Sequence, residues 1–431
     1  MKIRSVGLSA ILLSLLVACA RPGPAPIDLP TAPEGQRVDL AAPTFSHPTE
    51  VTNPLFPIAE LQRVILLGTM DGLPFRTETT LLPETKTIEW NGQTVETLAS
   101  QYAAFRDGRI HEVALDWYAQ ADDGSVWYFG EDVYNYENGV VADTDGTWQA
   151  GRDGPAAMIM PGSPQVGDVY RPENIPGMVF EEVTVESVGR TVHGPRGPVD
   201  GAIVVQELHM DGSTEGKIFA PGYGEFLTGS GGDLEAAALA VPIDARSEPV
   251  PADLESLSSA TRQIMEAARS EDWSAASASL ETVLAAWDSY RTGNQPRILE
   301  AQMTSALVKL VAAVDARQPT EAAQAAINVA RASLDFELRH RPLAEIDMAH
   351  FGLWAAQVIL DAGAGAPAVV AGDVATLEWI RDRIAHSLTS ADAEQISALL
   401  ADLRSAADNE DLAAAAEAAV QLQGHLTNLT G

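Results

Sequence analysis

The side chains with the clearest potential for chemistry lie in an alanine-rich, helix-forming stretch near the C-terminus. Asp347 and His350 are three residues apart, and with Asp361 they fall within about 60° of one another on a helical wheel of 100° per residue. Most other residues of this predicted helix are apolar, so the polar stripe should face polar groups inside the protein. Asp335 precedes it and His386 follows it on neighbouring predicted helices. Gathered in one place, these five side chains predict a site for a divalent metal ion.

Two interpretations of this stripe stay open. Ferritin-like bundles hold their metals with Glu-x-x-His pairs, and here Asp347 stands where such a pair has Glu. Without a thiolate, the site would favour zinc, iron(II), manganese or copper(II). Alternatively, the carboxylates form buried ion pairs with arginines that are near in sequence, which is the commoner role of such residues. The candidate arginines are Arg331, Arg339, Arg341 and Arg381.

A second candidate site is aromatic. Trp117, Trp127 and Phe129 belong to two sequence runs that alternate as β-strands do, and alternation places Trp127 and Phe129 on one face and Tyr128 on the other. One face should be core, and the other could stack on a sugar or cover an apolar ligand. Ordinary packing between strands would explain the same cluster, because cross-strand aromatic pairs stabilise sheets.

Signatures of known enzymes are missing from the chain. We find no G-x-S-x-G nucleophile elbow, no P-loop, no H-E-x-x-H motif and no complete EF-hand loop. The sequence therefore gives no positive indication of catalysis, and an enzyme of unrecognised type is the least supported class of function.

The N-terminus predicts export and lipid attachment. A short basic start is followed by an apolar run over residues 6–18, too short for the ~20 apolar residues of a spanning helix but typical of a signal peptide over residues 1–18. The run ends Leu16-Val17-Ala18-Cys19, which resembles the lipobox of bacterial lipoproteins. That resemblance implies cleavage before Cys19 and acylation of its thiol. Because Ala20 rather than Asp follows, it also implies the periplasmic side of the outer membrane in a cell that has one.

Composition limits the partners. The net charge is −33, and the chain contains a single cysteine. Such an acidic surface repels nucleic acid and anionic lipid headgroups, so acyl chains rather than charge should hold the protein on its membrane. A single cysteine leaves none for an intramolecular disulfide.

Turn signals divide the chain into segments. Residues 19–50 are rich in proline and predict a lipidated tether, and residues 51–242 contain repeated Asn-Gly and Asp-Gly pairs. These pairs favour tight hairpins, so this stretch predicts an antiparallel meander that forms a curved sheet or a barrel. The pairs are Asp71-Gly72, Asn91-Gly92, Asp107-Gly108, Asp123-Gly124, Asn138-Gly139 and Asp211-Gly212.

The β segment resembles a family of secreted bacterial β proteins of unknown function. The resemblance covers residues 50–242 and is carried by Thr52-Asn53-Pro54-Leu55-Phe56-Pro57, Asp116-Trp117-Tyr118-Ala119-Gln120, Val126-Trp127-Tyr128-Phe129-Gly130-Glu131 and Ala220-Pro221-Gly222-Tyr223-Gly224. It implies a terminal hairpin over residues 226–241. Local propensity opposes this, because the sequence LEAAALAV at 234–241 prefers helix. We expect the hairpin.

After a proline-flanked linker at 243–252, residues 253–431 have helical periodicity. Short connections favour antiparallel packing, and since the helical pairs do not align as repeats, we expect a closed bundle rather than a solenoid. The predicted helices span residues 252–270, 273–291, 297–316, 319–340, 344–363, 367–388, 390–407 and 409–428.

The fold expected is thus α+β, with an antiparallel β domain followed by an all-α bundle. The function expected is that of a membrane-anchored, non-enzymatic envelope lipoprotein that binds an apolar small ligand or a protein partner. A β meander on an acylated tether is broadly similar to periplasmic lipid-carrier half-barrels, at the level of fold only. Metal binding by the helical bundle is the alternative.

Overall fold

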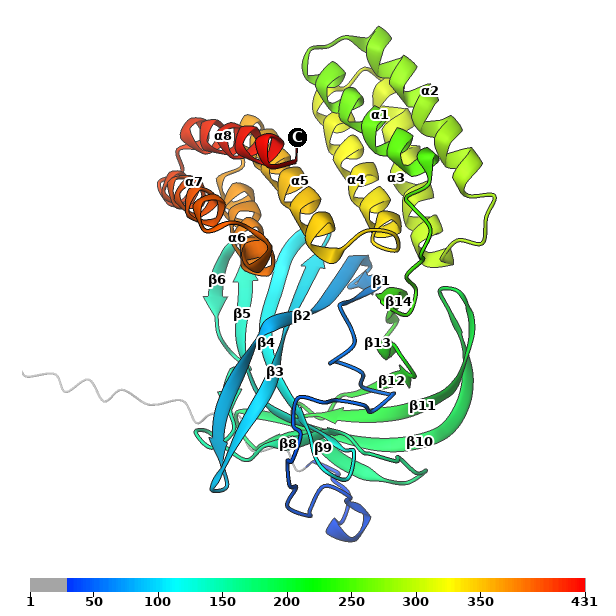
Figure 1. Ribbon diagram of the computed structural model, residues 1–431, viewed down its shortest axis with the longest axis vertical. Helices are drawn as coiled ribbons and strands as arrows, with labels where there is room; N and C mark the ends of the chain where they lie inside the picture. The colour runs from blue at the N-terminus through cyan, green and yellow to red at the C-terminus, as the bar shows by residue number, and fades with distance from the viewer. Residues whose placement is uncertain (1–28, 431) are drawn as a thin grey trace, which may run out of the picture.

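The computed structural model describes residues 29–430. Cys19, the predicted signal peptide and the first part of the predicted tether lie outside the described residues. A large curved sheet forms one half of the molecule, and helices gather at one end of it (Figure 1). The order of strands followed by helices confirms the α+β class expected from the sequence. Within the described part of the chain, no helix combines the length and hydropathy needed to cross a bilayer.

The sheet has 14 strands in the described part of the chain. The first eight are β1 (Arg63–Met70), β2 (Leu73–Trp90), β3 (Gln93–Arg106), β4 (Arg109–Gln120), β5 (Val126–Glu137), β6 (Val140–Asp143), β7 (Trp148–Gln149) and β8 (Ala157–Met160). The others are β9 (Val169–Ile175), β10 (Val179–Gly194), β11 (Gly197–His209), β12 (Thr214–Ala220), β13 (Gly224–Ser230) and β14 (Asp233–Val241).

Neighbouring strands in the sheet are mostly neighbours in sequence, as a meander requires. The order runs from β6 back to β1, then from β14 back to β9, with β7 and β8 paired to β5. The sheet is open, because β6 and β9 end it without pairing to each other. All six predicted Asn-Gly and Asp-Gly turns join consecutive strands. In four of them, such as Asn91-Gly92, both residues have positive φ, which these small residues tolerate.

The terminal hairpin is confirmed where local propensity opposed it. Strand β14 contains the alanine-rich run, and it pairs with β13 on one side and β1 on the other. Ala237 to Val241 are all buried. Burial against two neighbouring strands and the helices therefore outweighs the helical preference of this sequence.

Eight helices follow within the described residues, close to the predicted bounds. They are α1 (Ala252–Arg269), α2 (Trp273–Tyr290), α3 (Arg297–Asp315), α4 (Pro319–Glu337), α5 (Leu343–Gly363), α6 (Pro367–Ile384), α7 (Ser390–Asp408) and α8 (Leu412–Thr430). Side chains cap the N-termini of α2 and α7. Asp272 accepts a hydrogen bond from the Ala275 amide, and Thr389 accepts one from the Asp392 amide.

The all-helical region consists of two four-helix units. In the first, α1 packs on α2 and α4, and α3 packs on α4; in the second, α5 packs on α6 and α8, and α7 packs on both of these. The two units stand side by side at the end of the sheet and meet through α4 and α5 (Figure 1). Each has a core of its own that includes sheet residues, Ile65 and Leu239 in the first and Phe105 and Val113 in the second.

Alternation along β1 and β2 separates two faces of the sheet. Arg63 and Ile65 face the helices, whereas Val64 and Leu66 line a cavity on the other face. On β2, Thr77 and Thr79 line the cavity in the same way, and Arg76 and Glu78 reach the helices. We call the cavity side the inner face and the helix side the outer face. Consecutive residues of one strand therefore point to opposite faces, one into the cavity and the next toward the interface with the helices.

Residues 29–50 of the predicted tether pack on the sheet. The Ala32 amide donates to Glu182 over 2.7 Å, and the Phe45 ring lies 5.5 Å from that of Phe129. This segment also includes a short 3-10 helix, Glu34–Gln36. Any tether between membrane and protein thus consists of residues that precede these.

Candidate functional site

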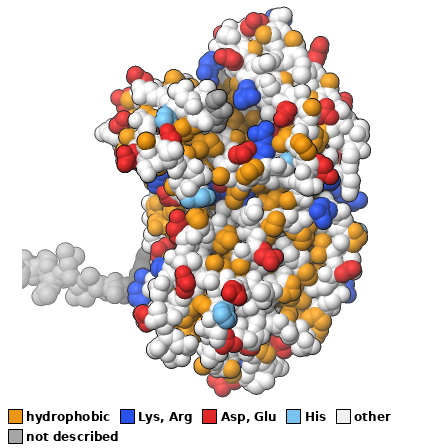
Figure 2. Space-filling model, in the orientation of Figure 1, with side chains coloured by type: hydrophobic (Ala, Val, Ile, Leu, Met, Phe, Trp, Pro, Cys, Tyr) orange, Lys and Arg blue, Asp and Glu red, His pale blue; other side chains and the backbone are white. Residues whose placement is uncertain are grey.

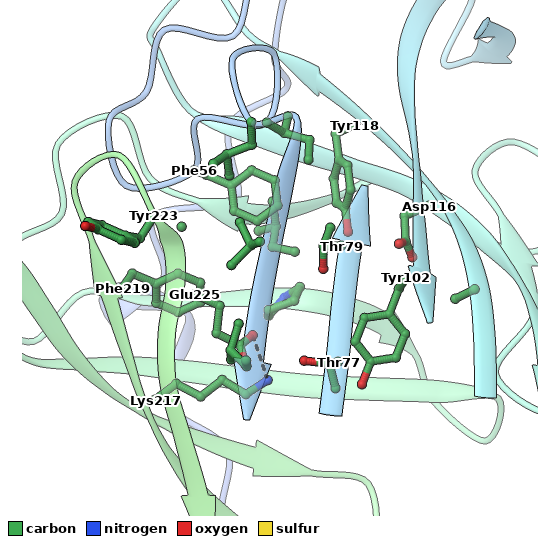
Figure 3. A pocket seen from close by; sticks show the side chains of 18 of the residues that line it. Phe56, Thr77, Thr79, Tyr102, Asp116, Tyr118, Lys217, Phe219, Tyr223 and Glu225 are labelled. Carbon is green, nitrogen blue, oxygen red and sulfur yellow. Dashed lines mark ion pairs between the residues drawn. The ribbon is translucent and has the colours of Figure 1, made fainter. Parts of the chain in front are cut away.

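A cavity of about 280 Å³ lies on the inner face of the sheet. Its walls come from β1 to β5 on one side and from β9 to β13 on the other, with residues 56–61 across them. In Figure 3, Tyr102, Asp116 and Tyr118 stand on one group of strands, and Lys217, Phe219 and Glu225 stand on the other. The volume is close to the lower end of the range typical of small-molecule sites.

Strand register explains which side chains meet there. Thr79 of β2 is opposite Tyr102 of β3, which is opposite Ala114 of β4. Asp116, two residues further along β4, is opposite Glu131 of β5. Since every second residue of a strand points to the same face, the curved sheet turns one row of side chains from each strand into the cavity.

The segment from Asn53 to Leu61 covers one side of the cavity. The Asn53 side-chain amide donates to the carbonyls of Gly124 and Pro161, over 3.0 Å each, and the Phe56 ring lies edge-on to Tyr118 at 4.9 Å. Tyr118 in turn stacks on Tyr128. These contacts fix an aromatic wall.

Four segments with aromatic and turn motifs, residues 52–57, 116–120, 126–131 and 220–224, converge on this cavity. Phe56, Asp116, Glu131 and Tyr223, one from each segment, all line it. Backbone hydrogen bonds also join them, as the Gly222 amide donates to the Pro54 carbonyl over 2.8 Å. The sequence therefore contained a signal for this site, although only the fold brings its parts together.

Carboxylates dominate the charged groups that line the cavity. Among the described residues they number six, against a single lysine, Lys217. The six are Glu112, Asp116, Glu131, Glu181, Glu207 and Glu225.

Asp116 lies on the β4 wall and has no cationic partner among the described residues. Its carboxylate accepts hydrogen bonds from the Tyr128 hydroxyl at 2.7 Å and from the Ser100 hydroxyl at 3.3 Å. Burial raises its pKa to about 7 in spite of both bonds, and the charge of Glu112 adds to the rise.

Glu131 shares a hydrogen bond with Glu173 of β9. A hydrogen bond between two carboxyl groups requires a proton on one of them. Burial and the neighbouring Asp116 hold the pKa of Glu131 well above its usual value. Burial likewise raises the pKa of Glu173, to about 8. Carboxyl groups on this side of the cavity therefore keep their protons to a higher pH than an ordinary aspartate or glutamate does.

Lys217 neutralises part of the opposite wall. Its ammonium lies 2.6 Å from Glu207 and 4.0 Å from Glu225. Burial alone would lower the pKa of Lys217, but these carboxylates raise it well above its usual value.

Glu181, Glu207 and His209 form the one group of potential metal ligands that the described residues bring within 4.8 Å of one another. His209 lies 3.5 Å from Glu181 and 3.7 Å from Glu215, and hydrogen bonds to both raise its pKa to about 10. A metal would need the neutral imidazole and would have to compete with Lys217 for Glu207. The negative charge of these carboxylates is therefore neutralised by Lys217 and by the protonated His209.

The carboxylates of the predicted metal site lie instead at the interface between sheet and helices. Asp335 is bound by both terminal nitrogens of Arg76, at 2.7 and 2.8 Å. Asp347 lies 2.8 Å from Arg63 and 3.2 Å from Arg383. Guanidinium groups thus occupy the space that a metal would need. This arrangement is the ion-pair alternative considered for these residues.

Asp361 and the two predicted histidines have different surroundings. Asp361 pairs with Arg109 of β4 at 2.8 Å. His350 is buried beside the ion pairs, and burial holds its pKa well below its usual value with help from the nearby arginines. His386 is exposed in the short 3-10 helix Ala385–Ser387, so it does not join them.

The arginine partners expected from sequence were wrong. Arg331 stacks over Trp354 at 3.9 Å, Arg339 bonds to Gln295, and Arg341 pairs with Glu337. The actual partners of the three carboxylates come mostly from β1, β2 and β4, far away in sequence. Nearness along the chain is a poor guide here because the strands pack directly on the helices.

The predicted aromatic site lies on the outer face of β4 and β5. Trp117, Trp127 and Phe129 are all buried in a core cluster, and none lines the cavity. Trp117 lies under the Lys86 ammonium, and the Trp127 indole donates to Ser125. Trp127 also lines a second hollow of about 290 Å³, between the sheet and residues 37–43.

Comparison of the sequence with protein-family models and with curated proteins found no match for this chain. The site is therefore interpreted from its own geometry and chemistry.

Proposed function

We propose that this protein is a lipid-anchored protein of the bacterial cell envelope that binds a small ligand in the inner-face cavity and catalyses no reaction on it. The anchor follows from the lipobox ending in Cys19. A binding role rests on the cavity itself, in which aromatic and aliphatic side chains surround a few buried polar groups. That combination is typical of ligand sites.

The observation that carries the proposal is the way the cavity is built. Four separate segments supply its lining, and Asn53 fixes the covering segment by hydrogen bonds to two loops. A hollow that only resulted from imperfect packing would not need buried carboxylates, which cost free energy in a core. The surface offers no comparable gathering of charge in the view of Figure 2, where acidic side chains are scattered.

Filling the cavity should abolish binding. Ala114 is buried on β4 and lines the cavity, so Ala114→Leu places a larger side chain inside it. We expect 2-phenylethanol, a small neutral probe, to bind the wild type and to bind this variant at least tenfold more weakly, a loss of about 1.4 kcal/mol. Calorimetric titration of the full chain in non-ionic detergent, with a detergent-only titration subtracted, measures both.

Ala142→Leu is the matched control, because Ala142 is exposed on β6 and far from the cavity lining. It should bind the probe as the wild type does. Equal binding by all three proteins would place the probe elsewhere, and no binding by the wild type would count against the proposed function.

The anchor is tested separately. Cys19→Ser removes the only thiol of the chain, so the variant should incorporate no fatty acid and keep its signal peptide. Metabolic labelling with a fatty-acid analogue reports the first effect, and the change in mass reports the second. Equal label in the wild type and the variant would contradict lipid attachment at this residue.

A further inference from the structure

Buried charge is balanced in one part of this protein and unbalanced in another. At the interface between sheet and helices, three arginines (Arg63, Arg76 and Arg383) contact three carboxylates (Glu78, Asp335 and Asp347) among the described residues. In the inner-face cavity, six carboxylates line the walls with one lysine. If all six were ionised, the described residues of the cavity would leave negative charge without a partner, so protons on these carboxyl groups or a bound cation must balance it.

The unpaired charge is concentrated on the side of β4 and β5. Asp116 and Glu131 are directly opposite each other on these strands, and Lys217 contacts two other carboxylates on the far wall. Hydroxyl groups bound to Asp116 can stabilise its charge but cannot neutralise it. Two like charges this close disfavour each other's ionisation. A cation between them would remove this cost.

A second observation points to a missing polar partner. Tyr170 of β9 lines the cavity and is fully buried, yet its hydroxyl has no hydrogen-bond partner among the described residues. Burying a hydroxyl without a hydrogen-bond partner is unfavourable. A ligand with a polar group in the cavity could satisfy it.

The rest of the lining is apolar and aromatic. Phe56, Tyr118 and Phe219 line the cavity (Figure 3), together with Leu61 and Leu66. Aromatic faces attract ammonium groups as well as apolar carbon. A bare metal ion would leave this volume empty, whereas an organic cation fills it.

We propose that the ligand of this cavity is a small organic amine, with its ammonium group at Asp116 and Glu131 and its apolar part against the aromatic wall. This rests on the proposed function, since it names the class of ligand that the site takes. The amine supplies the positive charge that the described residues on this wall lack.

A series of three probes of similar shape tests the charge preference. The probes are 2-phenylethylamine, 2-phenylethanol and 3-phenylpropanoate, titrated calorimetrically into the full chain at pH 8, where an alkylamine remains protonated as lysine does. We expect the amine to bind at least tenfold more tightly than the alcohol, and the carboxylate to bind most weakly. If the alcohol binds as tightly as the amine, the ligand class is wrong while the proposed function stands. If none of the three binds, the proposed function itself fails.

Variants then locate the ammonium. Asp116→Asn and Glu131→Gln keep the shape of the side chains and remove their charge, so each should reduce the preference for the amine at least fivefold and leave binding of the alcohol nearly unchanged. Glu84→Gln, which removes an exposed charge of β2, is the control and should change neither. Unchanged amine selectivity in both cavity variants would overturn the placement. Should one of them fail to fold, the other decides.

Tyr170→Phe separates a ligand contact from a structural role. Its hydroxyl has no partner among the described residues, so the variant should melt at or above the temperature of the wild type. We expect it to bind the amine two- to tenfold more weakly. Full affinity in this variant would show that the hydroxyl does not contact the ligand.

Discussion

Replacing Asp347 by Asn should lower the free energy of unfolding by about 3–5 kcal/mol, the usual cost of removing one member of a buried ion pair. Asp347 is almost fully buried on α5 and contacts Arg63 from β1 and Arg383 from α6. Its loss leaves two buried guanidinium groups with Glu78 as their remaining partner near this point. The measurement is urea denaturation followed by circular dichroism.

Two further variants test the physical cause. Asp382→Asn removes a carboxylate whose side chain is 48% exposed beside Arg381, so its effect should stay below about 1 kcal/mol. The double variant Arg63→Met with Asp347→Leu removes one charge of each sign and leaves Arg383 paired with Glu78. It should recover much of the stability, because apolar side chains can replace a buried ion pair at little cost. A double variant as unstable as Asp347→Asn would mean that shape rather than charge balance holds this interface.

This interface also explains what the sequence could not predict. The polar stripe of α5 was recognised, and its burial follows from the apolar residues around it. The partners of this stripe were not recognised, because Arg63 and Asp347 are 284 positions apart in the sequence and meet only where a strand packs on a helix. Arginines close in sequence were the natural candidates, yet Arg341, in the connection after α4, pairs with Glu337 at the end of that helix.

Local signals predicted more of the fold. Asp-Gly and Asn-Gly pairs placed the hairpin turns, since few other residues tolerate two positive φ angles in succession. Helical periodicity after the proline-flanked linker placed the helices within a few residues of their observed bounds. Strand β14 is the informative exception, because its helix-favouring alanines are buried between β1 and β13. Only contacts between distant residues could determine that outcome.

The sequence pointed to strands β4 and β5, but to other side chains than those that line the inner-face cavity. Trp117 attracted attention because large aromatic residues are common in binding sites, but it is buried in a hydrophobic core and does not line the cavity. Its neighbours Asp116 and Tyr118 line the cavity. Alternation separates the residues of a strand into two sets but cannot tell which set lines the inner-face cavity, since that depends on the curvature of the whole sheet.

The second large effect concerns pH. Asp116 has a folded-state pKa of about 7 because of burial, well above the 3.8 of an ordinary aspartate. Between these values the folded protein holds a proton that the unfolded chain has lost. This group therefore makes stability fall as the pH rises from about 4 to about 7. Since one pKa unit corresponds to about 1.4 kcal/mol, ionising Asp116 in the folded protein costs on the order of 4 kcal/mol.

Groups from three strands surround Asp116, and none of them carries a positive charge. The two hydrogen bonds to its carboxylate favour the ionised form, but burial outweighs them. Glu112 lies on its own strand and Glu131 on β5, while Tyr128 and Ser100 supply only hydroxyl groups. Tyr118 and Tyr128 stay neutral, because burial and the charge of Asp116 hold the pKa of each well above its usual value. Near pH 7 no described group on this wall therefore offers a positive charge to the carboxylate.

Asp116→Asn isolates this contribution, because Asn is neutral at every pH. Its carbonyl oxygen can still accept the hydrogen bond from Tyr128, and its amide nitrogen can donate to the Ser100 hydroxyl oxygen. Near pH 4, close to the pKa of an ordinary aspartate, the variant and the wild type should unfold with similar free energies. At pH 8 the variant should be the more stable by about 2–4 kcal/mol. Asp145→Asn, at an exposed turn position, should leave the difference between the two pH values unchanged. Urea denaturation curves of the three proteins at both pH values measure these free energies of unfolding. A variant that is no more stable than the wild type at pH 8 would show that Asp116 is already ionised at little cost, and the cavity would then hold its negative charge without needing either a proton or a cation.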